Sequence, residues 1–368
     1  MNYFPKVPTF PKVAIIIPAQ NEQKNIVRAI RSADQQTHPN KKIIVAVDNS
    51  SDYTYQIAKG RQSTVPNLTV FYTYENHGRK AGALNQAIDL YCQDADFIMV
   101  LDADTIAAPD VITEALRVLS TDSRLGAVCA LTHLTPLPKN ATFDQKIIWQ
   151  LQKLEYASAD SRRVEHPEDL QVLAGTCVVF RPSALVSVAK LIRQNGQYYD
   201  QTNLTEDYEL TLSLKKLGWL VTIGSKMHSW TDVPLSFSVH WHQRIRWARY
   251  HMDTLRQKGW NKDTRKDILS HVSFSFLFTQ QITFAAIATY LVITGTPFVW
   301  NPLLWVVVVL YWVDRMYRLK YVDNLTPADV TTRALIIPEE MYILLHSVER
   351  IWSYWLSFVN GPEEWRET

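Results

Sequence analysis

Two carboxylates separated by one residue, Asp102 and Asp104, come directly after an apolar run that ends at Leu101. A strand that ends in this way presents its carboxylates at the edge of an α/β sheet where ligands bind. Mg²⁺ and Mn²⁺ prefer oxygen ligands and commonly share them with substrate phosphates. The pair therefore predicts a divalent cation site that would neutralise charge on a diphosphate, although short acidic pairs also occur in ordinary turns.

Two other apolar runs end in polar residues of similar type. Pro18 and Glu22 stand at the end of the run Val13–Ile17, and Asp48 follows the run Lys42–Val47. An acid at the upper edge of a sheet is well placed to contact a nucleobase or a ribose. Taken alone, Asp48 would by default belong to an ordinary Asp/Asn/Ser turn, and a helix cap is the alternative for Pro18 and Glu22.

A basic loop and an acidic helix start supply further candidate groups. Lys80 lies in the small-residue loop Gly78–Asn85, which runs into a helix and suits a phosphate, but the spacing is not that of an ATPase loop. Glu206 and Asp207 follow Thr205 and precede the helical pattern Tyr208–Leu217. The alternative for this acidic pair is plain helix capping.

The last group lies in an aromatic and basic stretch, residues 236–257, whose spacing predicts a helix. It contains Gln243, Arg246 and Trp247. Arginine can bind a diphosphate at two points, and tryptophan offers a flat face to a sugar ring. A basic helix that touches anionic lipid is the alternative.

The elements that must position these residues alternate in the first half of the chain. Continuous apolar runs that read as buried strands are followed by helical patterns, which predicts a mostly parallel α/β sheet with helices on both faces. The expected strands are Val13–Ile17, Lys42–Val47, Leu68–Tyr72 and Phe97–Leu101, and the expected helices are Asn25–Gln35, Tyr53–Gln62, Lys80–Tyr91 and Pro109–Leu119. Beyond Gly126 the expected strands are short: Gly126–Leu131, Cys177–Phe180 and Leu220–Ile223.

Composition bounds the possible functions. The chain has 368 residues and a formal net charge of +2, so nothing in the charge balance requires a nucleic acid partner. Its three cysteines, Cys92, Cys129 and Cys177, are far apart, which disfavours a disulfide framework or a zinc site and fits a reducing, cytosolic setting. Residues 1–8 do not resemble a signal peptide, so we expect the first 260 residues to stay on the side where they are made.

Charge is distributed unevenly. Charged residues make up 20% of the chain, yet none lies between Asp267 and Asp314. Val272–Thr296 and Pro297–Val313 are long enough to cross a bilayer as a hairpin, and basic residues on both flanks predict that both ends are cytosolic. A buried helix pair in a soluble core is the alternative.

The segment from Pro338 to Val359 has a different pattern. Its apolar residues recur every three or four positions, and acidic residues occupy other positions. This predicts an amphipathic helix, rich in tryptophan, that lies either on a membrane surface or against the catalytic domain.

In their order along residues 13–250, these motifs resemble the family 2 glycosyltransferases, and in particular the membrane-integrated branch that includes cellulose, hyaluronan, chitin and poly-N-acetylglucosamine synthases. The complete Gln-x-x-Arg-Trp motif is the most discriminating part of the match, because many simpler relatives lack it. The resemblance implies a GT-A fold, an inverting single displacement, a nucleotide sugar donor that is UDP-linked, and Mn²⁺ or Mg²⁺ as cofactor.

The resemblance also implies a role for each residue. Pro18, Glu22 and Asp48 would contact the nucleoside, Lys80 and Asp102 would hold the diphosphate, and Asp104, with Asp102, would bind the metal. Asp207 would be the general base for the acceptor hydroxyl, which is a weak nucleophile without one. Gln243, Arg246 and Trp247, with Glu206, would serve the diphosphate and the acceptor sugar.

Departures from the family pattern leave alternatives open. Asn49 and Ser50 stand where many relatives have Asp and Gly, and one hairpin offers little lining for a polymer channel. The leading interpretation is transfer of a sugar to a glycan or lipid-linked acceptor at the cytosolic face of a membrane. A processive synthase that secretes its polymer as a homo-oligomer is the second, and an inactive membrane scaffold or sugar-nucleotide sensor is the third.

The expected organisation follows from these motifs. It comprises a GT-A catalytic domain (1–235), an interfacial region with the Gln-x-x-Arg-Trp motif (236–267), a transmembrane hairpin (268–320) and a C-terminal interfacial helix (321–368). The protein is expected to be integral to a membrane, with the catalytic domain in the cytosol and no nucleic acid partner.

Overall fold

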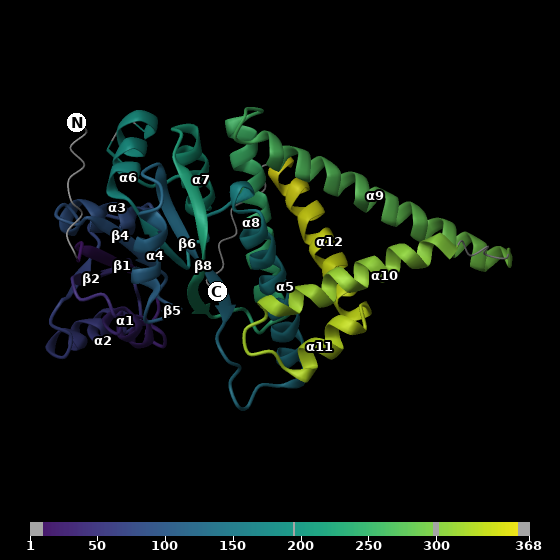
Figure 1. The fold of residues 1–368 in the computed structure, drawn as a ribbon, viewed down its shortest axis with the longest axis horizontal. Coiled ribbons are helices and arrows are strands. Elements are labelled where there is room, and N and C mark those ends of the chain that lie inside the picture. Colours follow the sequence, from purple (N-terminus) through teal and green to yellow (C-terminus); the bar gives the residue numbers. More distant parts are fainter. Residues whose placement is uncertain (1–9, 194–195, 297–301, 360–368) are drawn as a thin grey trace. The chain divides into compact units, whose positions relative to one another are not determined.

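The computed structural model of the chain describes residues 10–193, 196–296 and 302–359 (Figure 1). Its described residues form two compact units. The first is formed by the described residues of Met1–Pro138 and Ala159–Val233, and the second by those of Lys139–Ser158 and Pro234–Thr368. Residues 1–8, for which we expected no signal peptide, and residues 297–301 of the second expected membrane span lie outside the described residues.

The first unit is built on one eight-stranded mixed sheet with the order β3-β2-β1-β4-β7-β6-β8-β5. The pairs β1–β2, β2–β3, β1–β4 and β6–β8 are parallel, and β4–β7, β6–β7 and β5–β8 are antiparallel. The strands are β1 Val13–Ala19, β2 Lys41–Val47, β3 Leu68–Tyr72, β4 Phe97–Leu101, β5 Thr105–Ala107, β6 Leu125–Leu134, β7 Cys177–Phe180 and β8 Leu220–Thr231. The expected mostly parallel arrangement therefore holds for β1 to β4, whereas the second half of the sheet is mixed.

Helices cover both faces of this sheet, as the alternating pattern predicted. The helices are α1 Ile26–Asp34, α2 Thr54–Gly60, α3 Arg79–Tyr91, α4 Val111–Leu119, α6 Pro182–Val188 and α7 Glu206–Lys216. Odd-numbered residues of β1, such as Val13 and Ile15, join a core with α1, α2 and α4. Ala14 and Ile16 point the other way, into a core with α3, α6 and α7. Because side chains alternate along a strand, a run buried at every position requires both layers.

The second unit is helical. Its helices are α5 Phe143–Glu165, whose first part belongs here, α8 Phe237–Lys258, α9 Arg265–Thr294, α10 Pro302–Tyr317, α11 Pro327–Ala334 and α12 Ile337–Val359. Within the described residues, α9 is long and apolar enough to cross a membrane, and none of its most apolar window is buried. The side chains of α10 from Trp305 to Val313 are likewise exposed.

The amphipathic helix expected at the C-terminal end is present as α12, but its polar side faces inward. Its buried residues are polar with one exception, Tyr342: Glu339, Ser347, Glu349, Ser353 and Ser357. Its exposed residues are apolar and include Met341, Leu344, Trp352, Trp355 and Phe358. This distribution is the reverse of that on a helix of a water-soluble domain, which buries its apolar stripe.

Buried charges hold the second unit together. Arg333 of α11 is 1% exposed and donates to Glu339 Oε1 at 3.0 Å, to the Leu154 carbonyl at 2.9 Å and to Ser158 Oγ at 2.9 Å. Arg315 pairs with the same carboxylate, with its Nη2 2.5 Å from Glu339 Oε2. Polar contacts therefore connect α5, α10, α11 and α12, beside a small apolar cluster of Leu154, Ala157, Leu319 and Val322.

Replacing Arg333 by methionine is expected to lower the stability of the second unit. The change removes the bonds from Arg333 to Glu339, the Leu154 carbonyl and Ser158 Oγ, and leaves Arg315 as the remaining cation beside that buried carboxylate. A hydrogen bond to a charged group contributes about 1.5–3 kcal/mol, so a loss of that order is expected. The measurement is the midpoint of thermal unfolding of the protein in detergent micelles. Arg124→Met is the control because Arg124 pairs with Asp122 on the surface. Equal midpoints for the two variants would contradict the expectation.

Candidate active site

The polar residues that end β1, β2 and β4 meet at one edge of the sheet. Because β1 is parallel to both neighbours, with Ala19 opposite Val47 and Ile16 opposite Val100, the carboxyl ends of the three strands lie together. Pro18 is the penultimate residue of β1, and it is buried opposite Ala46. Asp48, Asp102 and Asp104 follow β2 and β4 directly, so four of the expected site residues share this edge.

Asp48 is fixed at the base of its loop. The residue is 3% exposed, and its Oδ1 accepts hydrogen bonds from Thr73 Oγ1 at 2.7 Å and from Asn49 Nδ2 at 3.1 Å. The loops after β1 and β2 are also tied to each other, because Asn21 Oδ1 accepts from the Ser51 amide at 2.8 Å. The expected nucleoside residue is thus held in a single orientation by its neighbours.

Lys80 forms ion pairs with two of the expected acids, Asp102 and Glu206. Its ammonium nitrogen lies 2.6 Å from Asp102 Oδ1 and 3.2 Å from Glu206 Oε1. Glu206 and Asp207 occupy the first turn of α7, where the positive end of the helix favours acidic side chains. Burial lowers the pKa of Lys80, but the charges of Asp102 and Glu206 outweigh this effect and raise the pKa well above its usual value.

A close approach of the backbone permits this grouping. Gly175 precedes β7, and a Cβ at this position would lie 3.1 Å from Lys80 Nζ and 3.6 Å from Asp207 Oδ2. Lys80, Gly175, Glu206 and Asp207 all line one pocket, whose other walls are apolar and include Leu173, Val178 and Phe180. A methyl group here would be tight against the Lys80 ammonium and in ordinary contact with Asp207, so that the ammonium would have to shift.

The surroundings of Asp207 shift its pKa toward neutrality. Burial raises its pKa to about 6, and the neighbouring charge of Glu206 adds to the shift. Its Oδ1 accepts a hydrogen bond from the Tyr208 amide at 2.8 Å, which fixes one carboxylate oxygen. A carboxylate with a pKa near neutrality, next to a pocket, suits proton transfer.

The acidic pair lies in a region of excess negative charge. Burial raises the pKa of Asp104 to about 6, and the charge of Asp102 adds to this. Burial also raises the pKa of Glu22 to about 7, against a hydrogen bond from Asn25, and the charges of Asp104 and Asp102 add to this rise. Elevated pKa values in several acids mean that their charges are poorly compensated. A divalent cation would supply the compensation, and the donors are all hard oxygens, so these residues fit Mg²⁺ or Mn²⁺.

Asp104 is hydrogen-bonded to residues at the edge of the sheet formed by β8 and β5. Its Oδ1 accepts from Thr105 Oγ1 at 3.1 Å and from Thr231 Oγ1, at the end of β8, at 3.3 Å. Arg28 donates to the Asp104 carbonyl at 3.0 Å and also pairs with Asp232. Asp232 was not among the expected site residues, although an acid that directly follows a strand is the same signal that marked Asp48. Gly175, by contrast, carried no sequence signal.

The remaining expected residues, Gln243, Arg246 and Trp247, lie on α8 in the second unit. Trp247 is 38% exposed. The side chain of Arg244, between them in sequence, is 10% exposed and pairs with Glu155 of α5 at 2.8 Å. That Gln243, Arg246 and Trp247 serve the diphosphate and the acceptor stays a prediction.

Comparisons with known proteins point to one family. The family model described as "Glycosyltransferase like family 2" matches residues 11–249. A poly-beta-1,6-N-acetyl-D-glucosamine synthase of Staphylococcus aureus (strain COL) is 27% identical over 240 residues, which are 64% of this chain and 54% of that protein. The synthase of the same name from Staphylococcus epidermidis is 26% identical over 267 residues, 71% of this chain and 59% of that protein. The chain thus spans little more than half the length of these curated relatives.

A solved structure shares the fold. The mannosyltransferase PcManGT from Pyrobaculum calidifontis, solved in complex with GDP-Man and Mn²⁺, superposes with a TM-score of 0.59 at 17% identity. The match covers 96% of this chain and 88% of that one. The mixed sheet of the first unit is therefore a GT-A type of fold, as the sequence motifs implied.

Gly175→Ala is expected to reduce sugar transfer about tenfold, because the new methyl group would push the Lys80 ammonium away from its carboxylate partners, and small displacements in a site are costly. The measurement is the initial rate of nucleoside diphosphate release at saturating donor. Gly60→Ala is the matched control, since a Cβ at Gly60 would meet no atom within 4 Å. A Gly175→Ala enzyme as fast as the Gly60→Ala enzyme would show that the close approach is not required.

Proposed function

Because the chain belongs to the Glycosyltransferase like family 2, we propose that it is a membrane-bound inverting glycosyltransferase. It would move a sugar from a nucleotide donor, UDP-linked, to a hydroxyl group of a glycan or lipid-linked acceptor. The observation that carries this proposal is the grouping of Lys80 with Asp102 and Glu206 beside Asp207, at the carboxyl edge of the sheet.

The donor would bind along that edge. Pro18, Glu22 and Asp48 would contact the nucleoside. Lys80 would pair with the diphosphate, for which its raised pKa guarantees a positive charge at neutral pH. Asp102 and Asp104 would hold Mn²⁺ or Mg²⁺, which, when bound, would offset the negative charge of the diphosphate.

Asp207 would act on the acceptor. Its carboxylate would accept the proton of the acceptor hydroxyl as that oxygen attacks the anomeric carbon and the nucleoside diphosphate departs. Base catalysis of this kind requires a pKa near the working pH, which the buried position beside Glu206 supplies. Trp247 would offer its ring to the acceptor sugar, and Gln243 and Arg246 would bind the diphosphate and acceptor, with Glu206 nearby.

The second unit would lie in and on a membrane. Helices α9, α10 and α12 expose many large apolar side chains, which a soluble monomer rarely does. Helix α12 also buries polar residues, a distribution that matches lipid as solvent. Helices α9 and α10 would form the transmembrane hairpin, α12 would lie at the surface, and the basic flanks would place the catalytic domain in the cytosol. The expected boundaries at residues 235, 267 and 320 belong to this proposal.

A processive synthase is the second candidate, favoured by the names of the relatives from the two staphylococci. A single hairpin would require several copies of the chain to build a polymer channel. Product length separates the two: a ladder of oligomers would favour the synthase, and a single added sugar would exclude it.

The decisive experiment is a donor screen with the full chain in nanodiscs. Release of nucleoside diphosphate is measured with Mn²⁺ and a panel that includes UDP-N-acetylglucosamine, UDP-glucose and GDP-mannose. Release from a UDP-linked sugar is the expected result, and retention of the protein in alkali-washed membranes is expected with it. No release from any donor would favour an inactive scaffold or sensor.

Asp207→Asn is expected to abolish transfer but to leave donor binding nearly unchanged, since the amide keeps the shape of the side chain and loses its basicity. In the unchanged enzyme, the rate should rise with pH through about 6, because the base is active only when deprotonated and its pKa is raised to that value. The measurements are kcat against pH and donor affinity by calorimetry. Loss of donor binding in this variant would contradict the assignment of Asp207 as the base.

Asp104→Ala is expected to weaken donor binding in the presence of Mn²⁺, with little change in its absence, because it removes a metal ligand and relieves repulsion from Asp102. Donor affinity is measured by calorimetry with and without Mn²⁺. Asp144→Asn, an exposed carboxylate change on α5, is the control. The same metal dependence in Asp104→Ala and the control would refute the ligand role.

A further inference from the structure

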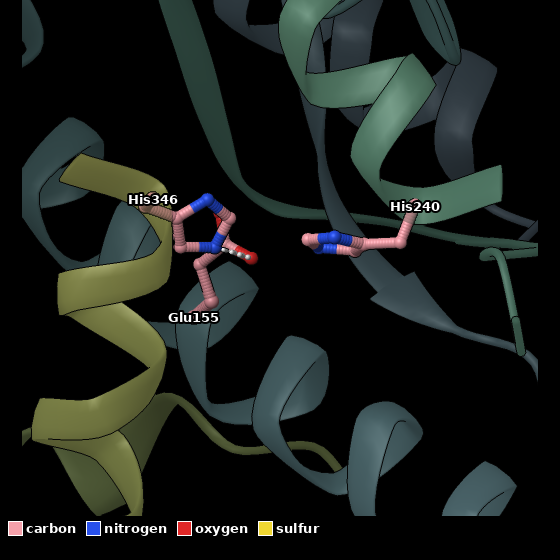
Figure 2. Close-up of side chains that lie close together, drawn as sticks. All are labelled: Glu155, His240 and His346. Atoms are coloured by element: carbon pink, nitrogen blue, oxygen red, sulfur yellow. Dashed lines mark ion pairs between the residues drawn. The ribbon is translucent and has the colours of Figure 1, made fainter. Parts of the chain in front are cut away.

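A cluster of titratable side chains lies within the second unit, apart from the proposed donor site. Figure 2 shows Glu155, His240 and His346 pointing toward one another from three helices, α5, α8 and α12. Each offers one ligand atom, and these atoms all lie within 4.8 Å of one another. Such a spacing is compatible with a metal centre. Whether the cluster binds a metal depends on the other groups that face these three ligand atoms.

Arg244 takes the place of a cation in this cluster. Its Nη2 donates to Glu155 Oε2 at 2.8 Å, and its Nε donates to His240 Nε2 at 3.3 Å. A metal ion on the same two ligand atoms would lie against the guanidinium, and two cations so close in a buried site repel strongly. The cluster is therefore a socket for the side chain of Arg244.

The socket joins polar groups to aromatic rings, because the guanidinium also lies over the Tyr156 ring, 5.8 Å from its centroid. Tyr342 donates to Glu155 Oε2 at 2.9 Å, and His346 Nδ1 lies 2.7 Å from Glu349 Oε2. Burial would raise the pKa of Glu155, but Arg244, followed by His346, outweighs it and lowers the pKa to about 2. Glu155 is thus charged at any working pH, and its bond to Arg244 is a charge-assisted one.

The same guanidinium touches the tryptophan of the Gln-x-x-Arg-Trp motif. The Cζ atom of Arg244 lies 4.8 Å from the centroid of the Trp247 ring, within the range of a cation–π contact. Arg244 and Trp247 are three residues apart on α8 and so share one face of the helix. A second contact holds this part of α8, since Ser353 of α12 donates to the Ile245 carbonyl at 3.3 Å.

We propose that Glu155 is a positioning residue for the acceptor: it holds the guanidinium of Arg244 against one face of the Trp247 ring and so fixes the ring that meets the acceptor sugar. This proposal rests on the proposed function, in which Trp247 contacts the acceptor. It gives α5 and α12 a role in binding the acceptor, although neither helix carries an expected site residue. Without the carboxylate, Arg244 can leave the ring, and the indole gains freedom that binding of the acceptor must remove.

The kinetic test is a double-mutant cycle with Glu155→Gln and Trp247→Ala. The probes are UDP-N-acetylglucosamine at saturation and a β-1,6-linked N-acetylglucosamine trisaccharide as varied acceptor. Glu155→Gln is expected to raise the KM for the trisaccharide about tenfold, in keeping with loss of one bond to a charged group. The donor KM should not change. In the Trp247→Ala background, Glu155→Gln should have no further effect, because its effect passes through the ring. Equal effects in both backgrounds would overturn the proposal.

A second measurement does not depend on turnover. With 5-fluorotryptophan incorporated, the ¹⁹F resonance of Trp247 is identified as the one absent from Trp247→Phe. Glu155→Gln is expected to shift this resonance, and the control Asp144→Asn on the same helix is not. An unchanged resonance would overturn the proposal. If the enzyme transfers no sugar from any donor, the proposed function fails, and the resonance still decides whether Glu155 positions the ring.

A third measurement tests whether the cluster of Glu155, His240 and His346 binds a metal. The purified full chain is incubated with Zn²⁺ alone, dialysed and assayed for bound metal. We expect the same metal content in the unchanged protein and in His346→Ala. One equivalent of zinc that is lost in His346→Ala and in Glu155→Gln would show that the cluster is a metal centre, and this would overturn the role assigned to Arg244.

Discussion

One ammonium group, that of Lys80, balances several carboxylates that a folded chain would otherwise keep apart. Asp102 comes from the end of β4, whereas Glu206 and Asp207 come from the start of α7. Their mutual repulsion is offset by one short ion pair, by the amide groups at the helix start and by the space that Gly175 leaves. Burial, with the remaining repulsion from neighbouring acids, raises the pKa values of Asp104 and Asp207 to about 6, so the charged forms are not fully compensated. The folded chain is thus less stable at this edge of the sheet than it would be with compensated charges. A ligand of opposite charge bound there would restore that stability.

The second unit obeys a different constraint. In water, burying apolar surface stabilises a helix pair, but α12 packs on α8 through serines, glutamates and a tyrosine. Hydrogen bonds such as that from Arg256 to Ser357, together with the Arg333–Glu339 pair, add to the small apolar cluster that includes Leu154 and Leu319. Lipid would cover the apolar side chains that remain. The polar contacts around Arg244 follow the same pattern, since Glu155, His240 and His346 meet there inside the helical unit.

The strands that could be predicted from the sequence are those in which a continuous apolar run indicates burial on both faces. β1, β3 and β4 begin at the expected residues, and β2 begins one residue earlier. β5 was missed because three residues become a strand only through pairing with β8. β8 was expected to end at Ile223 but continues to Thr231, since its polar residues are held by β6 and β5. For the site, strand ends located Asp48 and Asp102, whereas Gly175 acts through the space it leaves, which no local pattern records.

The hydroxyl contact between Thr105 and Thr231, 3.0 Å long, joins residues 126 positions apart. During synthesis, β1 to β4 emerge early and can pair with their neighbours, but the side of Asp104 that faces β8 has no partner until the chain has grown past residue 231. A nascent chain of half this length would therefore carry its acidic pair without the strand that orients it. The ribosome would then hold a precursor with most strands of the sheet formed, in which the hydroxyl groups of β8 do not yet orient the Asp104 side chain.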